Sequence, residues 1–331
     1  MRKRYPLNQS PLYRLHRRKS LGELLGLSVN ELETLANSNP PEYRCFERVI
    51  PREGKAPKRR WIEWPQARLQ RLQRRLARLL DRIEPPEYIH SAFRGRSYLT
   101  NARHHQCNVR VAKIDIRSFF PSSSATYVRR SFEDGFQCSP DVAAVLTKLT
   151  TIAGHLPTGG STSSIISFYA YKPMFDEIQR LVMARGLAMS CCVDDMTFSG
   201  QAATSDFLNQ VRLVVQRYGL KTHKRHCFEP GQTKVVTGVA LTPQGVRLPN
   251  ARRKKLHEAF EAFETECDLK NRIKLGERLL GRTTEAAQVE DQFRPLVRAA
   301  AAKLCEAKAE LRRARMVKWK SPLRTVQTPP F

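Results

Sequence analysis

The sequence contains no run of about eighteen apolar residues, the length that a membrane-spanning helix requires. Its basic start, MRKRYPLNQSPLYRLHRRKS, is not followed by an apolar segment, so we expect no secretory signal and no membrane partner. The eight cysteines are scattered, and only Cys191 and Cys192 are close together. We therefore expect neither a zinc site nor a disulfide framework, and we expect a reducing cytoplasm.

Acidic residues are also scarce, with 31 Asp and Glu against 58 Lys and Arg, a formal net charge of +27 over 331 residues. An excess this large repels itself, and a polyanion is the usual partner that relieves the repulsion. Apolar residues make up 41% of the chain, so a core can form and wholesale disorder is not expected. The composition indicates nucleic acid binding and leaves the chemistry open.

The first part of the chain shows patterns of both helices and strands. Ser28 followed by Glu31 predicts a capped helix start, and residues 42–64 predict two strands joined at Glu53-Gly54. Residues 66–83 (QARLQRLQRRLARLLDRI) predict a helix with a leucine-rich stripe and arginines mostly elsewhere. A solvated basic face and a binding surface are both open for these arginines.

The second part of the chain continues this mixed pattern. A helix is predicted over residues 163–185 with a kink at Pro173, and two strands that meet at a tight turn are predicted over 187–200. A further hairpin is expected over 235–248, and the chain after Pro249 is basic, alanine-rich and helical in pattern. The whole predicts an α+β core followed by a helical appendage.

Three aspartates stand where apolar strand residues belong. Asp115 lies in a strand predicted over 108–116 (NVRVAKIDI), and Asp194 and Asp195 lie between two predicted strands. Adjacent buried carboxylates repel unless divalent cations neutralise them, and oxygen ligands suit Mg²⁺. A strand-borne carboxylate beside a hairpin-borne pair is how a polymerase palm holds two ions. An Asp-Asp pair alone is also common in surface turns, so the flanking segments must decide.

Those segments resemble the reverse transcriptases of bacterial retrons, which are close to the group II intron enzymes. In order, they are residues 54–65 (GKAPKRRWIEWP), 115–122 (DIRSFFPS), 156–164 (LPTGGSTSS), 192–199 (CVDDMTFS) and Lys224 in THKRHCFEPG. The resemblance covers roughly residues 20 to 265. It implies a right-hand polymerase fold with fingers, palm and thumb, an antiparallel palm sheet and a helical thumb.

Two short segments favour the retron branch of this family. Residues 101–105 (NARHH) fit its NAxxH segment, and residues 236–238 fit its VTG segment. The chain departs from the family pattern at Cys192, where a tyrosine is usual, and at Thr158, where a glutamine is usual. Serines at 161 and 164 replace two prolines of the same loop. These departures put rate and fidelity in doubt and leave the three aspartates intact.

The resemblance implies roles for individual residues. Asp115, Asp194 and Asp195 would be catalytic and would hold two Mg²⁺ ions, for which Mn²⁺ can substitute. The predicted nucleotide-binding residues are Arg60, which would grip the triphosphate; Phe120, which would exclude a ribose 2′-hydroxyl; Thr158 and Gly159, which would line the site; and Lys224, which would protonate pyrophosphate. Arg59 or Lys58 could share the role of Arg60, and Lys224 could instead be a plain surface lysine.

The predicted RNA-binding residues lie in two places. They are Asn101 and His105 of the NAxxH segment and the consecutive cations Arg252, Arg253, Lys254 and Lys255 at a helix start. Further cations at Arg312, Arg313, Arg315, Lys318 and Lys320 lie near the end of the sequence. Charge of this kind supports affinity without specificity, so the recognised stem is not predicted.

The resemblance also implies the domain organisation. We expect a basic arm over residues 1–20, fingers over 21–100, a palm over 101–248 with part of the fingers around 121–160, and a helical thumb and basic tail over 249–331.

The predicted function is RNA-directed DNA polymerase, a nucleotidyltransferase that uses dNTPs. By resemblance, it would copy a cognate structured noncoding RNA from a guanosine 2′-hydroxyl and yield a branched RNA–DNA product (msDNA). Template removal would need a host RNase H, and antiphage defence with a separately encoded effector protein is typical of the family. Two alternatives stay open: a reverse transcriptase of another defence system or group II intron, and a structural RNA-binding subunit with a relic palm.

Overall fold

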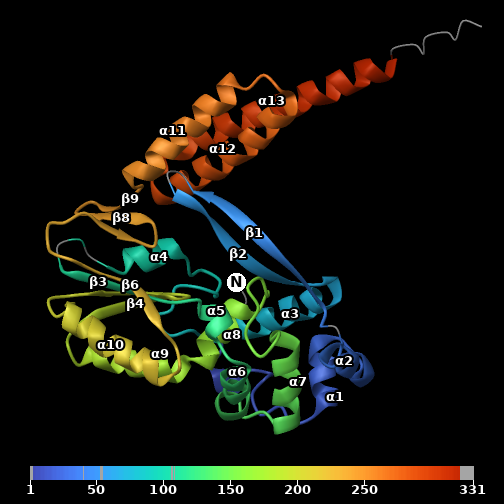
Figure 1. Ribbon diagram of the computed structural model, residues 1–331, viewed down its shortest axis with the longest axis vertical. Helices are drawn as coiled ribbons and strands as arrows, with labels where there is room; N and C mark the ends of the chain where they lie inside the picture. The colour runs from blue at the N-terminus through green and yellow to red at the C-terminus, as the bar shows by residue number, and fades with distance from the viewer. Residues whose placement is uncertain (1–2, 40, 53–54, 106, 108, 321–331) are drawn as a thin grey trace, which may run out of the picture. The chain divides into compact units, whose positions relative to one another are not determined.

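A computed structural model describes residues 3–39, 41–52, 55–105, 107 and 109–320, so the turn predicted at Glu53-Gly54 lies outside the described residues. The chain divides into two compact units, residues 1–237 and 238–331. Helices and antiparallel sheets are mixed, as the sequence predicts (Figure 1).

The first unit holds most of the secondary structure. Its helices are α1 (Arg18–Leu25), α2 (Val29–Ala36), α3 (Ala67–Leu80), α4 (Tyr98–Arg103), α5 (Phe119–Ser122), α6 (Ala125–Arg130), α7 (Pro140–Thr150), α8 (Ser163–Ala170), α9 (Lys172–Met183) and α10 (Ser205–Arg217), with short turns η1 (Leu7–Gln9) and η2 (Ser131–Gly135). Its strands are β1 (Tyr43–Arg52), β2 (Lys55–Pro65), β3 (Val111–Ile116), β4 (Ala188–Cys192), β5 (Asp195–Ser199), β6 (Thr222–Phe228) and β7 (Lys234–Val236).

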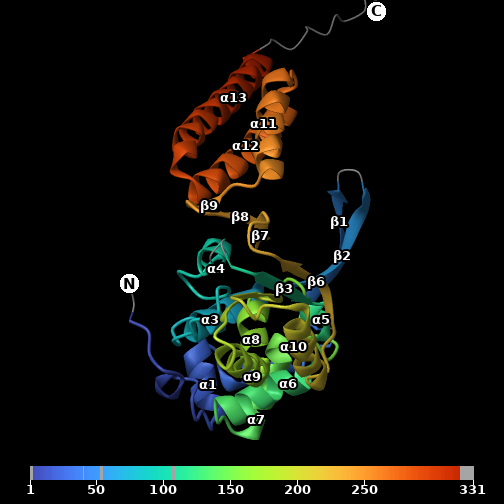
Figure 2. The ribbon, with the colours of Figure 1, turned by 90° about the vertical axis from the view of Figure 1, so that its left-hand side faces the viewer.

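A four-stranded sheet in the order β4-β5-β3-β6 forms the centre of this unit. Helices α9 and α10 pack against it (Figures 1 and 2). Along β3, Ala112, Ile114 and Ile116 are buried, whereas Lys113 and Asp115 are partly exposed. Because successive strand residues point to opposite faces, the apolar residues face the core and the charged ones face the other side.

Local sequence signals account for several elements of this unit. Ser28 and Glu31 form the predicted capping box at the start of α2. The predicted hairpin is present as β1 and β2, which extend out from the helices of the unit (Figure 2). The helix predicted over 163–185 is instead two helices, α8 and α9, that meet at the buried Tyr171. Pro173 lacks a backbone N–H and begins a helix more easily than it continues one, which explains the break.

The second unit contains a hairpin and a helical bundle. Strands β8 (Val239–Thr242) and β9 (Gly245–Arg247) pair antiparallel, and helices α11 (Asn250–Thr265), α12 (Leu269–Val289) and α13 (Arg294–Lys320) follow, with a short turn η3 (Asp291–Phe293) before α13. Helix α12 packs against both α11 and α13. At Gly276 of α12 an added Cβ would lie 3.0 Å from side-chain atoms of Leu304 and Phe263, so a glycine permits this close packing.

A buried carboxylate joins the hairpin of the second unit to its helices. Glu290, with a side chain 3% exposed, forms ion pairs with Arg247 at 3.0 Å and Arg253 at 2.8 Å. It also accepts a hydrogen bond from the Leu248 N–H at 2.8 Å. Burial opposes the charge, but the Leu248 N–H and the two arginines together hold the pKa of Glu290 below its ordinary value.

We expect Glu290→Gln to lower the free energy of unfolding of the second unit by about 1–3 kcal/mol at pH 7, because charge-assisted hydrogen bonds are lost. The folded pKa is lowered, so this contribution is complete above the unfolded value, near 4.5, and disappears as pH falls through the folded value. Urea denaturation at pH 7 and at pH 3 measures both effects. Glu306→Gln, on an exposed face of α13, is the control and should change little. Equal losses for both variants would contradict the assignment.

Among the described helices, none is both long enough and apolar enough to cross a membrane.

Candidate active site

The structure brings the three predicted carboxylates together. In the antiparallel pairing of β3 with β5, Asp115 lies directly opposite Asp195. Asp194 precedes β5 in the tight turn, and its carbonyl oxygen accepts a hydrogen bond from the Ile116 N–H at 3.0 Å. The turn is formed by Val193, which has a left-handed φ of 63°. The register of two strands therefore places residues that are about 80 positions apart in the sequence in one cluster.

Burial and like charge make this cluster electrostatically unfavourable. Burial and then the charges of Asp115 and Asp195 raise the pKa of Asp194 to about 6. Burial also raises the pKa of Asp195, although Lys113 opposes that shift. A cation bound between these buried carboxylates would offset their mutual repulsion and favour their ionised forms.

Two lysines and a histidine already lie beside the carboxylates. Lys224 Nζ is 3.2 Å from Asp115 Oδ2, and His223 Nδ1 is 3.4 Å from Asp115 Oδ1. Lys113 Nζ is 3.3 Å from Asp195 Oδ2. Lys113 was not among the predicted site residues. It could have been predicted from its position two residues before Asp115, because residues i and i+2 of a strand point to the same face.

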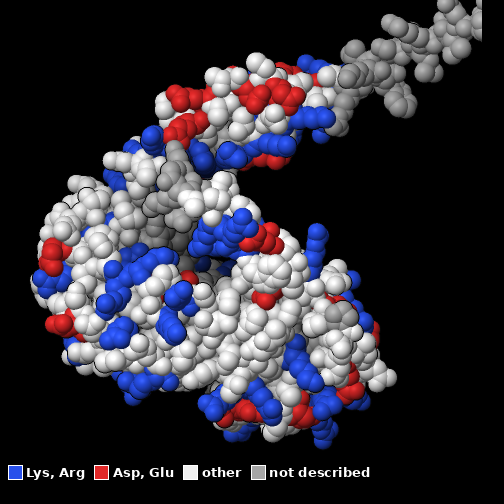
Figure 3. All heavy atoms as spheres, viewed as in Figure 1, with Lys and Arg blue, Asp and Glu red and all other residues white. Residues whose placement is uncertain are grey.

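A bulge in β6 positions Lys224. The pairing of β3 with β6 places Lys113 opposite His226 and Asp115 opposite His223, so two residues of β6 oppose Ile114 alone. Lys224 is one of those two and has a left-handed φ of 52°. Bulges beside active sites re-aim a side chain, and this one brings the Lys224 ammonium to Asp115. Figure 3 shows lysine and arginine side chains over the region where β6 lies, and Lys224 and Arg225 are exposed there.

The residues of the cluster fit a divalent cation. Within the described part of the chain, no three His, Cys, Asp or Glu side chains form a ready-made metal cage. However, Asp115 Oδ1 is buried and accepts no hydrogen bond from the described residues, although His223 Nδ1 lies 3.4 Å away, so a hard oxygen donor is available beside two further carboxylates. Oxygen donors of this kind suit hard divalent ions such as Mg²⁺.

The two phenylalanines after β3 have different surroundings. Phe119 is 3% exposed and packs against Tyr171 and Phe175 in the core. Phe120 is partly exposed, and its ring stacks on Phe119 at a centroid distance of 6.1 Å. The geometry thus agrees with a core role for Phe119 and leaves Phe120 free to face a ligand.

The predicted nucleotide loop is held by β2. The buried Glu63 carboxylate accepts a hydrogen bond from the Thr158 N–H at 3.0 Å and lies 2.9 Å from His155 Nε2. Gly159 has φ of 127°, and a Cβ there would lie 3.1 Å from the Glu63 carbonyl oxygen and 3.3 Å from Ile62 Cγ2. Glycine at 159 therefore allows the loop to approach the strand closely.

The hairpin register distinguishes Arg60 from Arg59. Arg60 pairs with Arg48 and shares a face with Ile62, which contacts Gly159. Arg59 lies on the other face, and its guanidinium is 3.0 Å from Glu47. Lys58, two residues from Arg60, shares the face of Arg60. Among the described residues Arg60 forms no ion pair. It therefore places an unpaired cation on the face of the hairpin that lies next to Gly159.

The side chains of Asn101 and His105 are buried, whereas direct contact with RNA requires an exposed side chain. Asn101 is 0% exposed, and its amide contacts Thr237 Oγ1 at 3.5 Å. His105 is 6% exposed and bridges the hydroxyls of Ser190 on β4 and Ser199 on β5, each at 2.7 Å. Burial lowers the pKa of His105 to about 3, so its ring stays neutral. These side chains join the NAxxH segment to the VTG segment and to the β4–β5 hairpin, and their burial argues against direct RNA contact.

The four consecutive cations of α11 are not equivalent. Arg252 forms an ion pair with Glu285, and Arg253 forms one with Glu290. Lys254 is 77% exposed and forms only a long ion pair, at 3.8 Å, with Glu258 one helical turn away. Lys255 is exposed as well. The two arginines therefore stabilise the second unit, and the two lysines keep their charged groups in solvent.

The remaining predicted cations are near the end of α13. The side chains of Arg312 and Arg313 are exposed. Those of Arg315, Lys318 and Lys320 lie outside the described residues.

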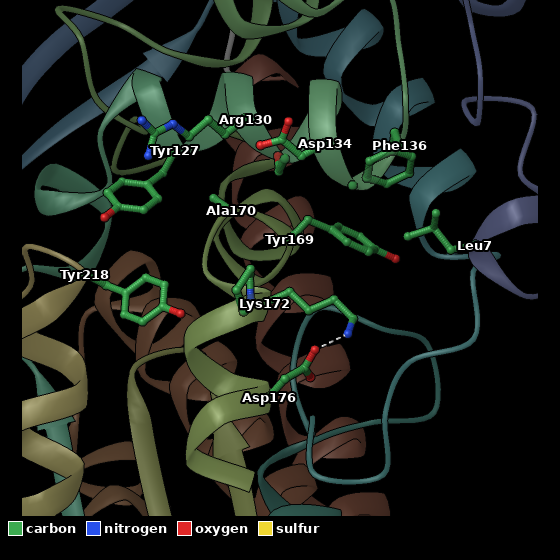
Figure 4. Close-up of a pocket in the computed structure, with 13 residues that line it drawn as sticks. Leu7, Tyr127, Arg130, Asp134, Phe136, Tyr169, Ala170, Lys172, Asp176 and Tyr218 are labelled. Atoms are coloured by element: carbon green, nitrogen blue, oxygen red, sulfur yellow. Dashed lines mark hydrogen bonds and ion pairs between the residues drawn. The ribbon is translucent and has the colours of Figure 1, made fainter. Parts of the chain in front are cut away.

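A pocket of about 390 Å³ lies elsewhere in the first unit. Tyr127 and Tyr218 form one wall, and Tyr169 and Leu7 lie at its other end (Figure 4). Lys172 at its edge is paired with Asp176. None of the predicted site residues lines this pocket, so it is separate from the carboxylate cluster.

Comparisons with known proteins point to one family. No family model matches the chain. The Retron Se72 reverse transcriptase of Salmonella heidelberg (strain 579083-10) is 29% identical over 233 residues, which are 66% of this chain and 60% of that protein. The Retron Ec86 reverse transcriptase of Escherichia coli is 26% identical over 255 residues, 73% of this chain and 78% of that protein. The Retron Mx162 reverse transcriptase of Myxococcus xanthus is 26% identical over 270 residues, 71% of this chain and 55% of that protein.

The matched region thus spans 60% of the Se72 protein and 55% of the Mx162 protein. These similarities cover 66–73% of this chain. Together they support a retron-type reverse transcriptase.

Proposed function

We propose that the chain is an RNA-directed DNA polymerase, a nucleotidyltransferase that copies RNA into DNA from dNTPs. The observation that carries the proposal is the pairing of Asp115 with Asp195 beside Asp194 in an antiparallel sheet. In this proposal, the four-stranded sheet is the palm, the β1–β2 hairpin belongs to the fingers, and the helices of the second unit form the thumb.

The carboxylates would hold two Mg²⁺ ions, with Mn²⁺ as a substitute. Bound ions would lower the pKa of the attacking sugar hydroxyl and stabilise the departing pyrophosphate. Asp115 and Asp194 are the stronger candidates for ligands, because the Asp195 carboxylate is already paired with Lys113. Lys113 would then orient Asp195 and neutralise part of the charge of the cluster.

The neighbouring residues would bind and position the nucleotide. Arg60 would contact the triphosphate, because a guanidinium matches phosphate oxygens and this side of the hairpin faces Gly159. Phe120 would occupy the space beside C2′ of the sugar. Lys224 would donate a proton to pyrophosphate, from a position beside Asp115. Thr158 would line the site through its loop, which Glu63 holds in place.

The retron-specific part of the proposal rests on the family resemblance. The substrate would be a cognate structured noncoding RNA, primed from a guanosine 2′-hydroxyl, and the product a branched RNA–DNA molecule. A host RNase H would remove template, and a separately encoded effector would act with the enzyme in antiphage defence in the cytoplasm. A reverse transcriptase of another defence system or a group II intron would share the same carboxylate geometry.

The full chain, purified with its bound nucleic acid, tests the proposal. We expect DNA synthesis that depends on Mg²⁺ and stops on chelation. Sequencing of the copurifying nucleic acid should show DNA joined to RNA at a guanosine, which would separate the retron reading from other reverse transcriptases. RNA binding without any DNA synthesis under Mg²⁺ or Mn²⁺ would instead indicate an RNA-binding subunit with a relic palm.

The two exposed lysines of α11, Lys254 and Lys255, allow a prediction about RNA binding. We expect Lys254→Gln with Lys255→Gln to lower the log–log salt slope of RNA binding by about 1.4–1.8, because each lost phosphate contact removes about 0.7–0.9. Fluorescence anisotropy with the copurified RNA at several salt concentrations measures this slope. Arg252→Gln with Arg253→Gln removes the same charge but should mainly lower the melting temperature, because both arginines hold acidic partners. An unchanged slope for the lysine variant would mean that these residues are merely solvated.

A further inference from the structure

The exposed surface of α3 consists almost entirely of arginine. Leu69, Leu72, Leu76 and Leu80 are buried, and the exposed residues of the helix are Ala67, Arg68, Arg71, Arg74, Arg75 and Arg78. The helix contains no acidic residue and no lysine. At 100° per residue the five arginines fall within one arc of about 120°, so they form a single face of the helix.

Two of these arginines hold the helix to its neighbours. Arg68 lies 3.5 Å from Glu31 of α2, and Arg75 donates a hydrogen bond to the Leu24 carbonyl oxygen at the end of α1. The other three arginines lack acidic partners: within the described part of the chain, no carboxylate lies within 4 Å of Arg71, Arg74 or Arg78. Arg71 donates only to the Ala67 carbonyl oxygen of its own helix. These three residues, spaced i, i+3 and i+7, are called the α3 arginine stripe below.

We propose that the α3 arginine stripe binds the phosphate backbone of RNA. This inference rests on the proposed function, because it adds a second RNA contact surface to that of α11. The stripe extends about 10 Å along the helix, comparable with about three successive phosphates of one nucleic acid strand. Guanidinium groups match phosphate oxygens in geometry, and the absence of lysine from the stripe fits that use.

The composition of the surface disfavours other partners. A membrane-surface helix needs exposed apolar residues to insert, and α3 exposes only Ala67 besides its arginines. A solvated helix face usually alternates charges of both signs, and this face has one sign only. Five like charges on one face also repel one another, and a polyanion relieves that repulsion.

The buried face of α3 is hydrogen-bonded to the loop that contains Thr158 and Gly159. Gln73 is 0% exposed and lies among the leucines on the side opposite the stripe. Its amide oxygen accepts a hydrogen bond from the Ser161 N–H at 3.1 Å, and its amide nitrogen donates to the Tyr43 hydroxyl at 2.9 Å and the Leu149 carbonyl at 3.0 Å. RNA held by the stripe is therefore held at a constant distance from the loop of Thr158 and Gly159.

The test replaces Arg71, Arg74 and Arg78 together by glutamine, which preserves helix propensity. The full chain, freed of nucleic acid, is titrated with a fluorescent hairpin RNA that carries a single-stranded extension, at several salt concentrations. We expect affinity at least about tenfold weaker and a salt slope lower by about 2–2.7, from three lost contacts. The corresponding lysine triple variant should keep most of the slope and lose part of the affinity.

A matched control removes the same charge elsewhere on the first unit. Arg130 of α6 and Arg180 of α9 are exposed and Arg212 of α10 is partly exposed, and among the described residues none of the three forms an ion pair. Their replacement by glutamine should leave RNA affinity within about threefold of the unchanged chain. Equal losses in the two triple variants would show a general charge effect and overturn the proposal. An unchanged salt slope of RNA binding in the stripe variant would also overturn the proposal. So would a stripe variant that binds RNA normally but no longer binds vesicles of anionic lipid.

The outcome is separable from that of the proposed function, because binding is measured without synthesis. If the unchanged chain makes no DNA but the stripe variant loses RNA, the polymerase is refuted and the RNA surface stands. If DNA synthesis is observed and the stripe variant binds RNA normally, only the stripe is refuted. Melting temperatures of the variants within about 2 °C of the unchanged chain would confirm that binding, and not folding, was tested.

Discussion

Asp194→Asn should reduce DNA synthesis by about a thousandfold or more and leave RNA binding within about twofold of the unchanged chain. Metal ligation contributes several kcal/mol to the transition state, and about 1.4 kcal/mol corresponds to a factor of ten in rate. The substitution removes a ligand charge with almost no change in volume. Primer extension under Mg²⁺ and anisotropy with copurified RNA measure the two quantities. Wild-type-like extension would contradict the metal assignment.

The same substitution should raise the melting temperature of the metal-free chain. Burial and the charges of Asp115 and Asp195 raise the pKa of Asp194 to about 6, so its ionised form destabilises the folded state above that pH. The gain should therefore be present at pH 7.5 in a chelator and absent at pH 3, where the carboxyl is protonated in both states. Asp206→Asn, on the exposed start of α10, is the matched control and should change neither activity nor stability strongly.

Phe120→Val should let the enzyme incorporate ribonucleotides at least about tenfold more readily relative to deoxyribonucleotides. The ring is partly exposed and five residues beyond Asp115, where its removal would open space beside C2′ of the nucleotide. A discrimination that depends on shape alone is worth about 1–3 kcal/mol, which corresponds to a factor of ten to a few hundred. Primer extension with one ribonucleotide at a time measures the ratio of kcat/KM values.

Phe119 is the natural comparison for this experiment. Its side chain is buried against Tyr171 and Phe175, so Phe119→Val should lower stability by about 1–3 kcal/mol without changing sugar discrimination. If Phe119→Val relaxes discrimination and Phe120→Val does not, the roles of the two residues are exchanged. If neither does, the sugar is discriminated elsewhere in the site.

The carboxylate cluster could be predicted from sequence because its signal is local. Asp115 interrupts a strand pattern, and Asp194 and Asp195 occupy a turn between two apolar strands, so residue type and spacing suffice. The capping box at Ser28 and the β1–β2 hairpin were predictable for the same reason. The helix predicted over residues 163–185 with a kink at Pro173 is two separate helices, because the apolar periodicity continues across Pro173 whereas proline offers no backbone N–H there.

The charged residues required the structure. Lys113 resembles any strand lysine until the pairing of β3 with β5 places it beside Asp195. The register alone separates Arg60 from Arg59, because a shift of one residue reverses the face of the hairpin. Asn101 and His105 form a motif in the sequence, but their burial against Thr237, Ser190 and Ser199 appears only in three dimensions.

By itself, the sequence determined which residues could do chemistry, the order of the helices and strands around them, and an excess of positive charge that calls for nucleic acid. The tertiary structure decided which of those positive charges are paired with carboxylates and which remain unpaired and able to bind phosphate. Arg252 is neutralised by Glu285, 33 positions away, whereas Arg71, Arg74 and Arg78 meet no carboxylate among the described residues. The reason is physical: an ion pair depends on a few ångströms of distance, and only the folded chain sets that distance for residues far apart in sequence.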